Sequence, residues 1–274
     1  MTTVTFPRAS STPLATVSQP APEVWMLSMH NLPDNRLLPE FIKTALLPAL
    51  DHIELAFHRQ AEKGSKKGAL VLVGETGVGK FFSNGLQLEC LKEYPTFFRD
   101  YYYVLLSRLL TFPLPTVAAI NGHCFAGGLC LALACDWRVC RPDRTWLSMN
   151  ELLFGAPIPT GMSALLSARL SPPVLRKVLL TAHKYTAPEA LAEGLVDEVA
   201  PEQGSGKCVE RAVQRAGELK ATAESGVLSA MKRTMYASTL AQLAQDEQVR
   251  LGGAQKDNAE RFKALVQAEG MAKL

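Results

Sequence analysis

Residues 116–135, TVAAINGHCFAGGLCLALAC, form a run of twenty amino acids without Asp, Glu, Lys or Arg. An apolar run of this length is long enough to span a lipid bilayer as one helix. However, Asn121 and Gly122 stand inside it, and an Asn-Gly pair is a turn signal. The run therefore predicts a buried strand at 116–120, a turn and a buried helix at 126–135, with no segment inserted in a membrane.

Short strands and amphipathic helices alternate along most of the remaining chain. Strands are predicted at 23–29 and 137–140, and a compact apolar run predicts another at 69–73. Helices are predicted at 38–62 and 94–110, where apolar residues recur every three or four positions. Further along, strand patterns stop and helical spacing continues. The predicted fold class is therefore α/β, with parallel strands and a helical C-terminal region.

Four segments divide the chain. Residues 1–22 are rich in Ser, Thr, Pro and Ala and lack an apolar core, which predicts a disordered tail and not a secretory signal. The folded core is expected at 23–205 and the helical region at 206–271. Residues 272–274 are Ala-Lys-Leu, close to the Ser-Lys-Leu peroxisomal address. This tripeptide predicts a peroxisomal protein that an import receptor recognises.

Charge and metal-binding patterns exclude several classes of function. The formal net charge of +3 is spread thinly over 274 residues, so binding to nucleic acid is not expected. The six cysteines lack a C-x-x-C pair, and the five histidines lack an H-E-x-x-H motif. These spacings predict buried, reduced thiols and no metal site.

Residues 74–80, GETGVGK, imitate a phosphate-binding loop directly after a predicted strand. Such a loop needs Ser or Thr after its Lys to bind magnesium, and a helix must begin there so that amide groups face the phosphates. Phe81 occupies that position, and the following Phe-Ser-Asn-Gly favours a strand and a turn. We therefore expect a flexible turn here and no nucleotide site.

Gly127 and Gly128 open the apolar helix that is predicted after the Asn-Gly turn. Two explanations for them are open. Glycines at this place let a ligand approach the backbone, where the free N–H groups of a first helical turn stabilise a developing negative charge. Alternatively, they permit close packing of the helix.

Glu151 is the one ionisable residue between positions 146 and 168. Burial among apolar groups raises the pKa of a carboxyl group, which suits a general base near neutral pH. The alternative is an acid on a loop that points into water. A serine hydrolase is disfavoured, because the chain has no G-x-S-x-G motif.

These stretches together resemble the crotonase, or enoyl-CoA hydratase/isomerase, superfamily. The similar pieces are GKFFSNGLQL, PTVAAINGHCFAGGLCLALACDWRV, LSMNELLFGAPIPTGMSALL and LTAHKYTAPEALAEGLVDEV, and the resemblance runs from about residue 23 to residue 201. It implies a crotonase-like β-β-α spiral core that binds acyl-CoA, with a helical C-terminal trimerisation region in a homotrimer or hexamer. It implies no cofactor, because coenzyme A is part of the substrate.

In this family two backbone N–H groups bind the thioester oxygen as an enolate. By motif match, these oxyanion-hole donors are Leu86 and Gly127, and the catalytic carboxylate is Glu151. Further substrate-binding residues that the resemblance marks are Ser83, Asn84, Gly85, Leu88, Phe125 and Phe154. Leu152 and Ile158 are additional candidates for acyl-pocket walls, although core packing is the commoner role of such side chains.

The number of carboxylates separates the subfamilies. Hydratases use two glutamates, and the first of them aligns with Cys130 while the second aligns with Glu151. One glutamate is enough to move a proton between carbons, as in peroxisomal Δ3,Δ2-enoyl-CoA isomerases, which MNELLFG also resembles. The resemblance thus implies that a 3-enoyl-CoA of fatty acid β-oxidation becomes a trans-2-enoyl-CoA. Alternatives are a hydratase-like enzyme of β-oxidation or secondary metabolism, and a non-catalytic acyl-CoA-binding member.

Overall fold

The computed structural model describes residues 3–8, 10–74, 80–245 and 253–271. Within these ranges, seven strands form one sheet in the order β1-β2-β3-β4-β6-β8-β10, and β5, β7 and β9 form a smaller sheet. The strands of the larger sheet are β1 (Val4–Phe6), β2 (Ala15–Ala21), β3 (Val24–Met29), β4 (Ala69–Val73), β6 (Thr116–Ile120), β8 (Trp137–Cys140) and β10 (Glu198–Val199). Those of the smaller sheet are β5 (Phe81–Ser83), β7 (His123–Phe125) and β9 (Leu147–Ser148).

The chain spirals between the two sheets. β4, β6 and β8 are parallel neighbours in the larger sheet, and each is followed by one of the parallel strands β5, β7 and β9 of the smaller sheet. Helical segments then return the chain to the larger sheet: α2 (Cys90–Glu93), η2 (Phe98–Tyr102) and α3 (Tyr103–Leu110) after β5, α4 (Gly127–Ala134) after β7, and η3 (Glu151–Phe154) with α5 (Thr160–Arg169) after β9. This is the predicted β-β-α spiral.

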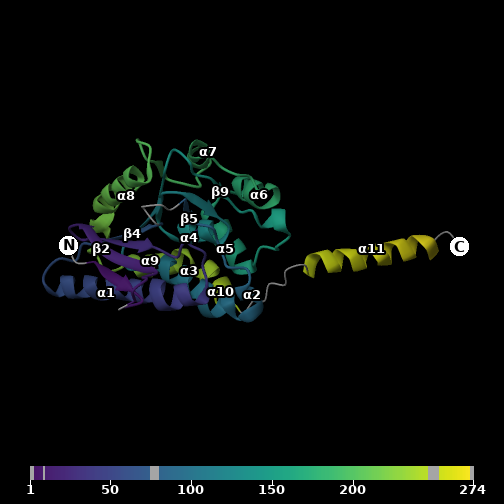
Figure 1. Cartoon of the computed structure of the whole chain (residues 1–274), viewed down its shortest axis with the longest axis horizontal. Coiled ribbons are helices and arrows are strands. Elements are labelled where there is room, and N and C mark those ends of the chain that lie inside the picture. Colours follow the sequence, from purple (N-terminus) through teal and green to yellow (C-terminus); the bar gives the residue numbers. More distant parts are fainter. Residues whose placement is uncertain (1–2, 9, 75–79, 246–252, 272–274) are drawn as a thin grey trace.

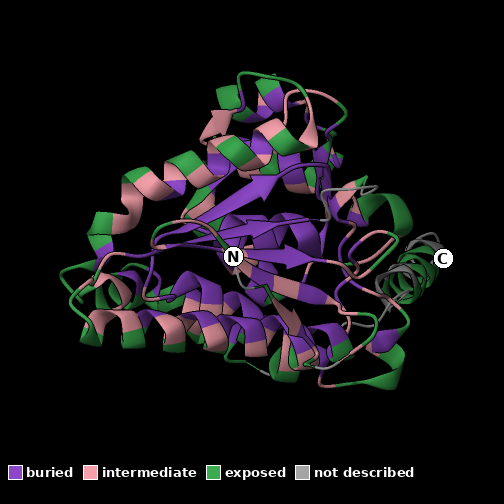
Figure 2. Cartoon of the chain, turned by 60° about the vertical axis from the view of Figure 1, so that its left-hand side comes forward, coloured by how far each residue is buried: buried purple, intermediate pink, exposed green. Residues whose placement is uncertain are grey.

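The larger sheet separates two apolar layers. Along β4, Leu70 and Leu72 join the main core, whereas Val71 and Val73 face the opposite side. This alternation follows from the two-residue period of a strand. The main core lies under η1 (Phe41–Leu46), α1 (Leu47–Glu62), α3 and α4, and α8 (Ser205–Leu219) covers the other side (Figure 1). With both faces covered, β4 and β6 are buried along their whole lengths, and the centre of the sheet is purple in Figure 2.

The uncharged run at 116–135 folds as expected. β6 occupies 116–120, a turn follows, and every residue of α4 is buried. Among the residues that the structure describes, no helix is both long and apolar enough to cross a membrane. The strands predicted at 69–73 and 137–140 are likewise confirmed as β4 and β8.

The N-terminal segment corrects one prediction. Residues 1–22 were expected to be a disordered tail, but β1 and β2 pair antiparallel and extend the larger sheet beyond β3. Ala15 and Val17 are buried on one face of β2, whereas Thr16 and Ser18 are partly exposed. This short alternation supplies enough apolar contact for strand pairing. The Ser, Thr and Pro content of the segment nevertheless suggests disorder, which is why the sequence did not predict these strands.

The C-terminal region is helical, as predicted. After α6 (Pro172–Thr181) and α7 (Ala187–Ala192), α8 is followed by η4 (Lys220–Ala223), α9 (Leu228–Met235), α10 (Ala237–Leu243) and α11 (Gly253–Met271). In Figure 1, α11 extends away from the rest of the chain. A role of this region in trimerisation stays a prediction. The tripeptide 272–274 and the loop residues 75–79 lie outside the described residues.

A buried ion pair attaches α9 to the larger sheet. Lys232 is 5% exposed, and its Nζ donates to Asp136 Oδ2 at 2.6 Å. It also donates to the carbonyl oxygens of Phe112 at 3.0 Å and Leu114 at 2.9 Å. The same Asp136 oxygen accepts the backbone N–H of Thr116 at 2.8 Å, at the start of β6. One ammonium group therefore satisfies three acceptors, two in the segment before β6 and one immediately before β8.

We predict that Lys232→Met destabilises the protein by about 3 kcal/mol, because it leaves the partly buried Asp136 carboxylate without its cation. Urea denaturation measures the effect as a lower midpoint at an unchanged slope. Lys207→Met is the matched control, since Lys207 also forms an ion pair, with Glu210 at 2.9 Å, but on the surface. Equal midpoints for the two variants would contradict the prediction.

Candidate active site

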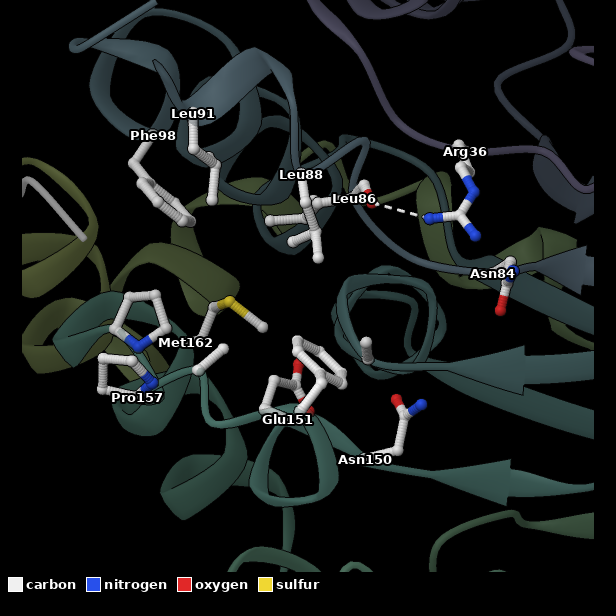
Figure 3. Close-up of a pocket in the computed structure, with 14 residues that line it drawn as sticks. Arg36, Asn84, Leu86, Leu88, Leu91, Phe98, Asn150, Glu151, Pro157 and Met162 are labelled. Carbon is white, nitrogen blue, oxygen red and sulfur yellow. Dashed lines mark hydrogen bonds between the residues drawn. The ribbon is translucent and has the colours of Figure 1, made fainter. Parts of the chain in front are cut away.

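A pocket of about 290 Å³ opens between the loop after β5, the start of α4 and the segment 150–162 (Figure 3). Its lining residues are Arg36, Asn84, Leu86, Leu88, Leu91, Phe98, Ala126, Asn150, Glu151, Phe154, Ala156, Pro157, Pro159 and Met162. Arg36 and Asn84 lie at one end in Figure 3, whereas Leu91, Phe98 and Pro157 lie at the other. The pocket therefore has one polar and one apolar end.

Glu151 lies between these two ends as the first residue of η3. It is 7% exposed, and its Oε2 atom has no hydrogen-bond partner among the described residues. Burial raises the pKa of Glu151 to about 7. The apolar surroundings expected from the sequence are thus confirmed, and the alternative of an acid pointing into water is wrong. A carboxylate with this proton affinity can accept and return a proton near neutral pH.

The backbone around Leu86 presents a free N–H group. Leu37 N donates to Gly85 O at 2.8 Å, and Gln87 N donates to Leu37 O at 3.0 Å. Because successive groups of an extended chain point in opposite directions, Leu86 N–H points away from Leu37. It makes no hydrogen bond with any residue that the structure describes.

The start of α4 supplies a second N–H group. Gly127 is the first residue of the helix, where N–H groups have no intrahelical acceptor. Gly85 has a φ of +87°, and a Cβ on it would lie 3.2 Å from Gly127 N. A Cβ on Gly127 would lie 2.8 Å from Leu86 Cδ2. Because Gly85 and Gly127 have no side chains, the two segments lie close to each other at the pocket.

Gly128 has a different role from Gly127. A Cβ on Gly128 would lie 2.6 Å from the carbonyl oxygen of Ser83, so glycine is required for α4 to pack against β5. The packing explanation therefore applies to Gly128, whereas the approach of a ligand to Gly127 N–H stays a prediction.

Ala126 holds an unusual conformation immediately before α4. Its φ of 51° and ψ of −127° are rare for a residue with a side chain, and they cost on the order of 1–3 kcal/mol. Ala126 N donates to Ser148 O at 2.8 Å, which fixes this residue against β9. Such strain persists only where surrounding contacts impose it, and it concentrates at functional sites.

Cys130 lies in α4, fully buried beneath the pocket. Burial raises the pKa of its thiol well above the usual range, and the nearby Glu151 carboxylate adds to this effect. The thiol therefore stays protonated near neutral pH. As the sequence indicated, it cannot do the work of a second glutamate. All six cysteines lie within the described residues, and they are buried and free.

The structure brings together five of the predicted site residues as lining of the pocket. They are Asn84, Leu86, Leu88, Glu151 and Phe154. Gly127 lies beside them, because a Cβ on it would touch Leu86.

Other predicted site residues do not line this pocket, and their contact with a substrate stays a prediction. Ser83 and Gly85 do not line the pocket; Ser83 is buried, and its hydroxyl donates to Asn35 O at 2.8 Å. Phe125 does not line it either, since its ring stacks on His123 at 5.6 Å between centroids. Leu152 is 57% exposed, and Ile158 packs against the main core. Side chains in a strand alternate between faces, so a residue beside the motif need not face the ligand.

Sequence reasoning missed most of the apolar wall. Leu91, Phe98 and Met162 come from α2, η2 and α5, where the apolar pattern predicts only that a side chain is buried. Arg36 was also missed. It forms an ion pair with Asp34 at 3.0 Å, and Asn84 Nδ2 donates to the same carboxylate oxygen at 2.7 Å. The Asp-Asn-Arg sequence before the first predicted helix was its only local signal.

The structure also bears on the phosphate-loop string and on metal binding. β5 begins at Phe81, so a strand and not a helix follows the GETGVGK string, against the geometry of a phosphate loop. Among the described residues, no group of three His, Cys, Asp or Glu side chains is placed to hold a metal ion.

Known proteins are similar to this chain both in sequence and in fold. Residues 48–270 match the enoyl-CoA hydratase/isomerase family. Enoyl-CoA delta isomerase 3 of Arabidopsis thaliana is 32% identical over 224 residues, covering 78% of this chain and 89% of the relative. A putative enoyl-CoA hydratase of Thermus thermophilus is 35% identical over 200 residues, covering 70% and 72%. The solved structure of a Mycobacterium tuberculosis enoyl-CoA isomerase has a TM-score of 0.71 and 26% identity, covering 84% and 94%. The chain therefore belongs to the enoyl-CoA hydratase/isomerase family.

Proposed function

We propose that this protein is a Δ3,Δ2-enoyl-CoA isomerase, which converts a 3-enoyl-CoA into the trans-2-enoyl-CoA. The observation that carries the proposal is a single buried carboxylate, Glu151, between the polar and apolar ends of a pocket. Its pKa of about 7 suits a group that must both take and return a proton.

The proposed reaction uses these groups in sequence. The thioester oxygen accepts hydrogen bonds from Leu86 N–H and Gly127 N–H, and the acyl chain extends toward Leu91 and Phe98. Glu151 removes a proton from C2, and the electron pair delocalises into a dienolate whose negative oxygen the two amides stabilise. Each such donor is worth on the order of 3 kcal/mol. Glu151 then returns the proton to C4, and the double bond moves into conjugation with the thioester.

Cys130 supports isomerisation over hydration. Hydration needs one group to activate water and another to deliver a proton, and the thiol that aligns with the first glutamate of the hydratases is buried and protonated. Relatives from Arabidopsis that are named enoyl-CoA delta isomerases lend further support. The second candidate is a hydratase-like enzyme, favoured by the putative hydratase of Thermus thermophilus at 35% identity.

The wider setting belongs to the same proposal. The enzyme would need no cofactor, because coenzyme A arrives with the substrate, and it would act as a homotrimer or hexamer. Its pathway would be peroxisomal fatty acid β-oxidation, with Ala-Lys-Leu recognised by the import receptor. Two relatives are named peroxisomal isomerases, at 31% and 35% identity.

We predict that the protein isomerises 3-hexenoyl-CoA and hydrates 2-hexenoyl-CoA poorly, since Glu151 has no partner acid at Cys130. Product analysis of the two substrates side by side measures this directly. Faster hydration than isomerisation would identify the hydratase-like alternative, and binding without either product would identify a non-catalytic member.

The rate of isomerisation should depend on the ionisation of Glu151. A base must be deprotonated, so kcat/KM is expected to fall about tenfold for each pH unit below about 7 and to level off above it. Glu151→Gln keeps the size of the side chain but cannot accept the proton. It should lose at least about 10⁴ in kcat, on the order of 5 kcal/mol. Retention of more than about a tenth of the wild-type rate would mean that another group moves the proton.

Ionisation of Glu151 should also change the free energy of unfolding with pH, and the same measurements show whether the Glu151→Gln variant is folded. The folded-state pKa is raised from 4.5 to about 7, so ionisation of Glu151 is disfavoured in the folded protein. Wild type should therefore lose stability relative to the variant as pH rises from 4.5 to 7, on the order of 3 kcal/mol in total. Urea midpoints at pH 5 and pH 8 test this, with Glu202→Gln, an exposed carboxylate, as the control.

Removal of Ala272 to Leu274 should leave the isomerase active but cytosolic. The physical reason is that an import receptor reads a short C-terminal tripeptide as an address, separately from the catalytic core. Fluorescence microscopy of tagged full-length and truncated chains, each expressed without an intact partner chain, measures the distribution. Peroxisomal location of the truncated chain would show that another signal directs import.

A further inference from the structure

We propose that Tyr102 is a positioning residue of the oxyanion site, which holds the Gly127 segment in place through a hydrogen bond to the Gly127 carbonyl. This inference rests on the proposed function. Tyr102 is the last residue of η2 and is fully buried. Its hydroxyl donates to Gly127 O at 2.6 Å.

The start of α4 needs such a contact. Ala126 has a left-handed φ of 51°, and no side chain caps the helix. A residue keeps a strained backbone conformation only where contacts on both sides of it fix the chain. Ala126 N is held on one side by Ser148 O at 2.8 Å, and the Tyr102 hydroxyl holds Gly127 on the other. Gly127 N–H lies in the peptide plane between these two contacts, and the carbonyl oxygen of that plane, Ala126 O, accepts Leu129 N at 2.9 Å. The Tyr102 hydroxyl therefore fixes the C-terminal side of the segment that presents Gly127 N–H.

Tyr102 itself is held rigidly by aromatic neighbours. Its ring lies parallel to that of Phe97 at 6.3 Å between centroids and meets the ring of Phe98 edge-on at 6.3 Å. Burial raises the pKa of Tyr102 well above its usual range, so the hydroxyl remains a donor throughout the pH range in which Glu151 works. Phe98 also lines the apolar end of the pocket, which connects this aromatic cluster to the acyl chain.

The hydroxyl acts through Gly127 and not on the substrate. Tyr102 is absent from the lining of the pocket. A Cβ on Gly127 would lie 3.1 Å from the Tyr102 hydroxyl and 2.8 Å from Leu86 Cδ2, so Gly127 is enclosed between Tyr102 and the residue that supplies the other N–H group. A small displacement of Gly127 would change the spacing of the two donors.

Tyr102→Phe tests this role with the loss of a single oxygen atom. The Gly127 carbonyl lies in the first turn of α4, where it also accepts the regular helical bond, so the fold should survive the change. Misplacing an oxyanion donor should cost less than removing it, which costs about 10²–10³ in kcat. We expect kcat to fall on the order of tenfold, with KM changed less than about twofold.

A spectroscopic signature separates positioning from general stability. 4-(Dimethylamino)cinnamoyl-CoA is a conjugated 2-enoyl thioester whose absorption moves to longer wavelength when its carbonyl oxygen is polarised. The full-length wild-type protein should produce this red shift, and Tyr102→Phe should produce a clearly smaller one. Tyr185→Phe is the matched control, because Tyr185 is also fully buried and its hydroxyl donates one hydrogen bond, to Glu193 Oε2 at 2.9 Å. It should leave the red shift and kcat unchanged.

A second variant keeps the donor. 4-Aminophenylalanine at position 102 replaces the hydroxyl by an N–H donor that is weaker, so its red shift and kcat should lie between those of Tyr102→Phe and the wild type. Equal red shifts and equal kcat in the amino and Phe variants would mean that the loss in both comes from altered packing of the ring. The hydrogen bond to Gly127 would then not be the cause, which overturns the proposal.

The remaining outcomes distinguish the positioning role from the proposed function. A red shift and kcat in Tyr102→Phe equal to those of the wild type would overturn the role of Tyr102 and leave the isomerase proposal intact. A wild-type protein that shifts the chromophore but forms no product from 3-hexenoyl-CoA would overturn the isomerase proposal alone. In that case, a smaller shift in Tyr102→Phe still supports the positioning role. No shift in the wild type would overturn both.

Discussion

The close approach between the Gly85–Leu86 turn and the first residue of α4 is the constraint on which the site depends. β5 pairs with β7, which brings the ends of both strands to one edge of the smaller sheet. Glycine at 85 and at 127 then removes the side chains that would separate the two segments. The remaining spiral supplies the frame: a sheet buried on both faces cannot shift its strands without disrupting two apolar layers.

Glu151 illustrates how function opposes stability in this fold. Its carboxylate is buried without a hydrogen bond to Oε2 among the described residues, and ionisation there is unfavourable. The protein elsewhere pairs its buried charges: Lys232 contacts Asp136, and Arg138 contacts Asp197 at 2.6 Å. A carboxylate left without such a partner at a pocket is therefore an exception to the pattern of the molecule, and perturbed groups of this kind concentrate at functional sites.

The sequence predicted what depends on local pattern. β4 and β6 were found within their bounds because a parallel strand buried on both faces is a nearly continuous apolar run. Glu151 was found because one charge among apolar residues is conspicuous. The N-terminal strands were missed because their composition suggests disorder while a period-two pattern only a few residues long carries their pairing. Arg36, Phe98 and Met162 were missed because tertiary packing alone decides which buried or half-buried side chains reach a common pocket.

The replacement of a second acid by Cys130 has consequences beyond the loss of a proton carrier. A glutamate in the middle of α4 would need a polar partner or water, because a buried charge is costly. Here the helix is apolar along its length, and Tyr102 uses its hydroxyl on the Gly127 carbonyl. The buried Cys130 thiol and the Tyr102 ring therefore take the place that a second carboxylate would need. In the proposed function, the packing that holds Gly127 in place and the lack of a second carboxylate at Cys130 have a common origin in the apolar character of α4.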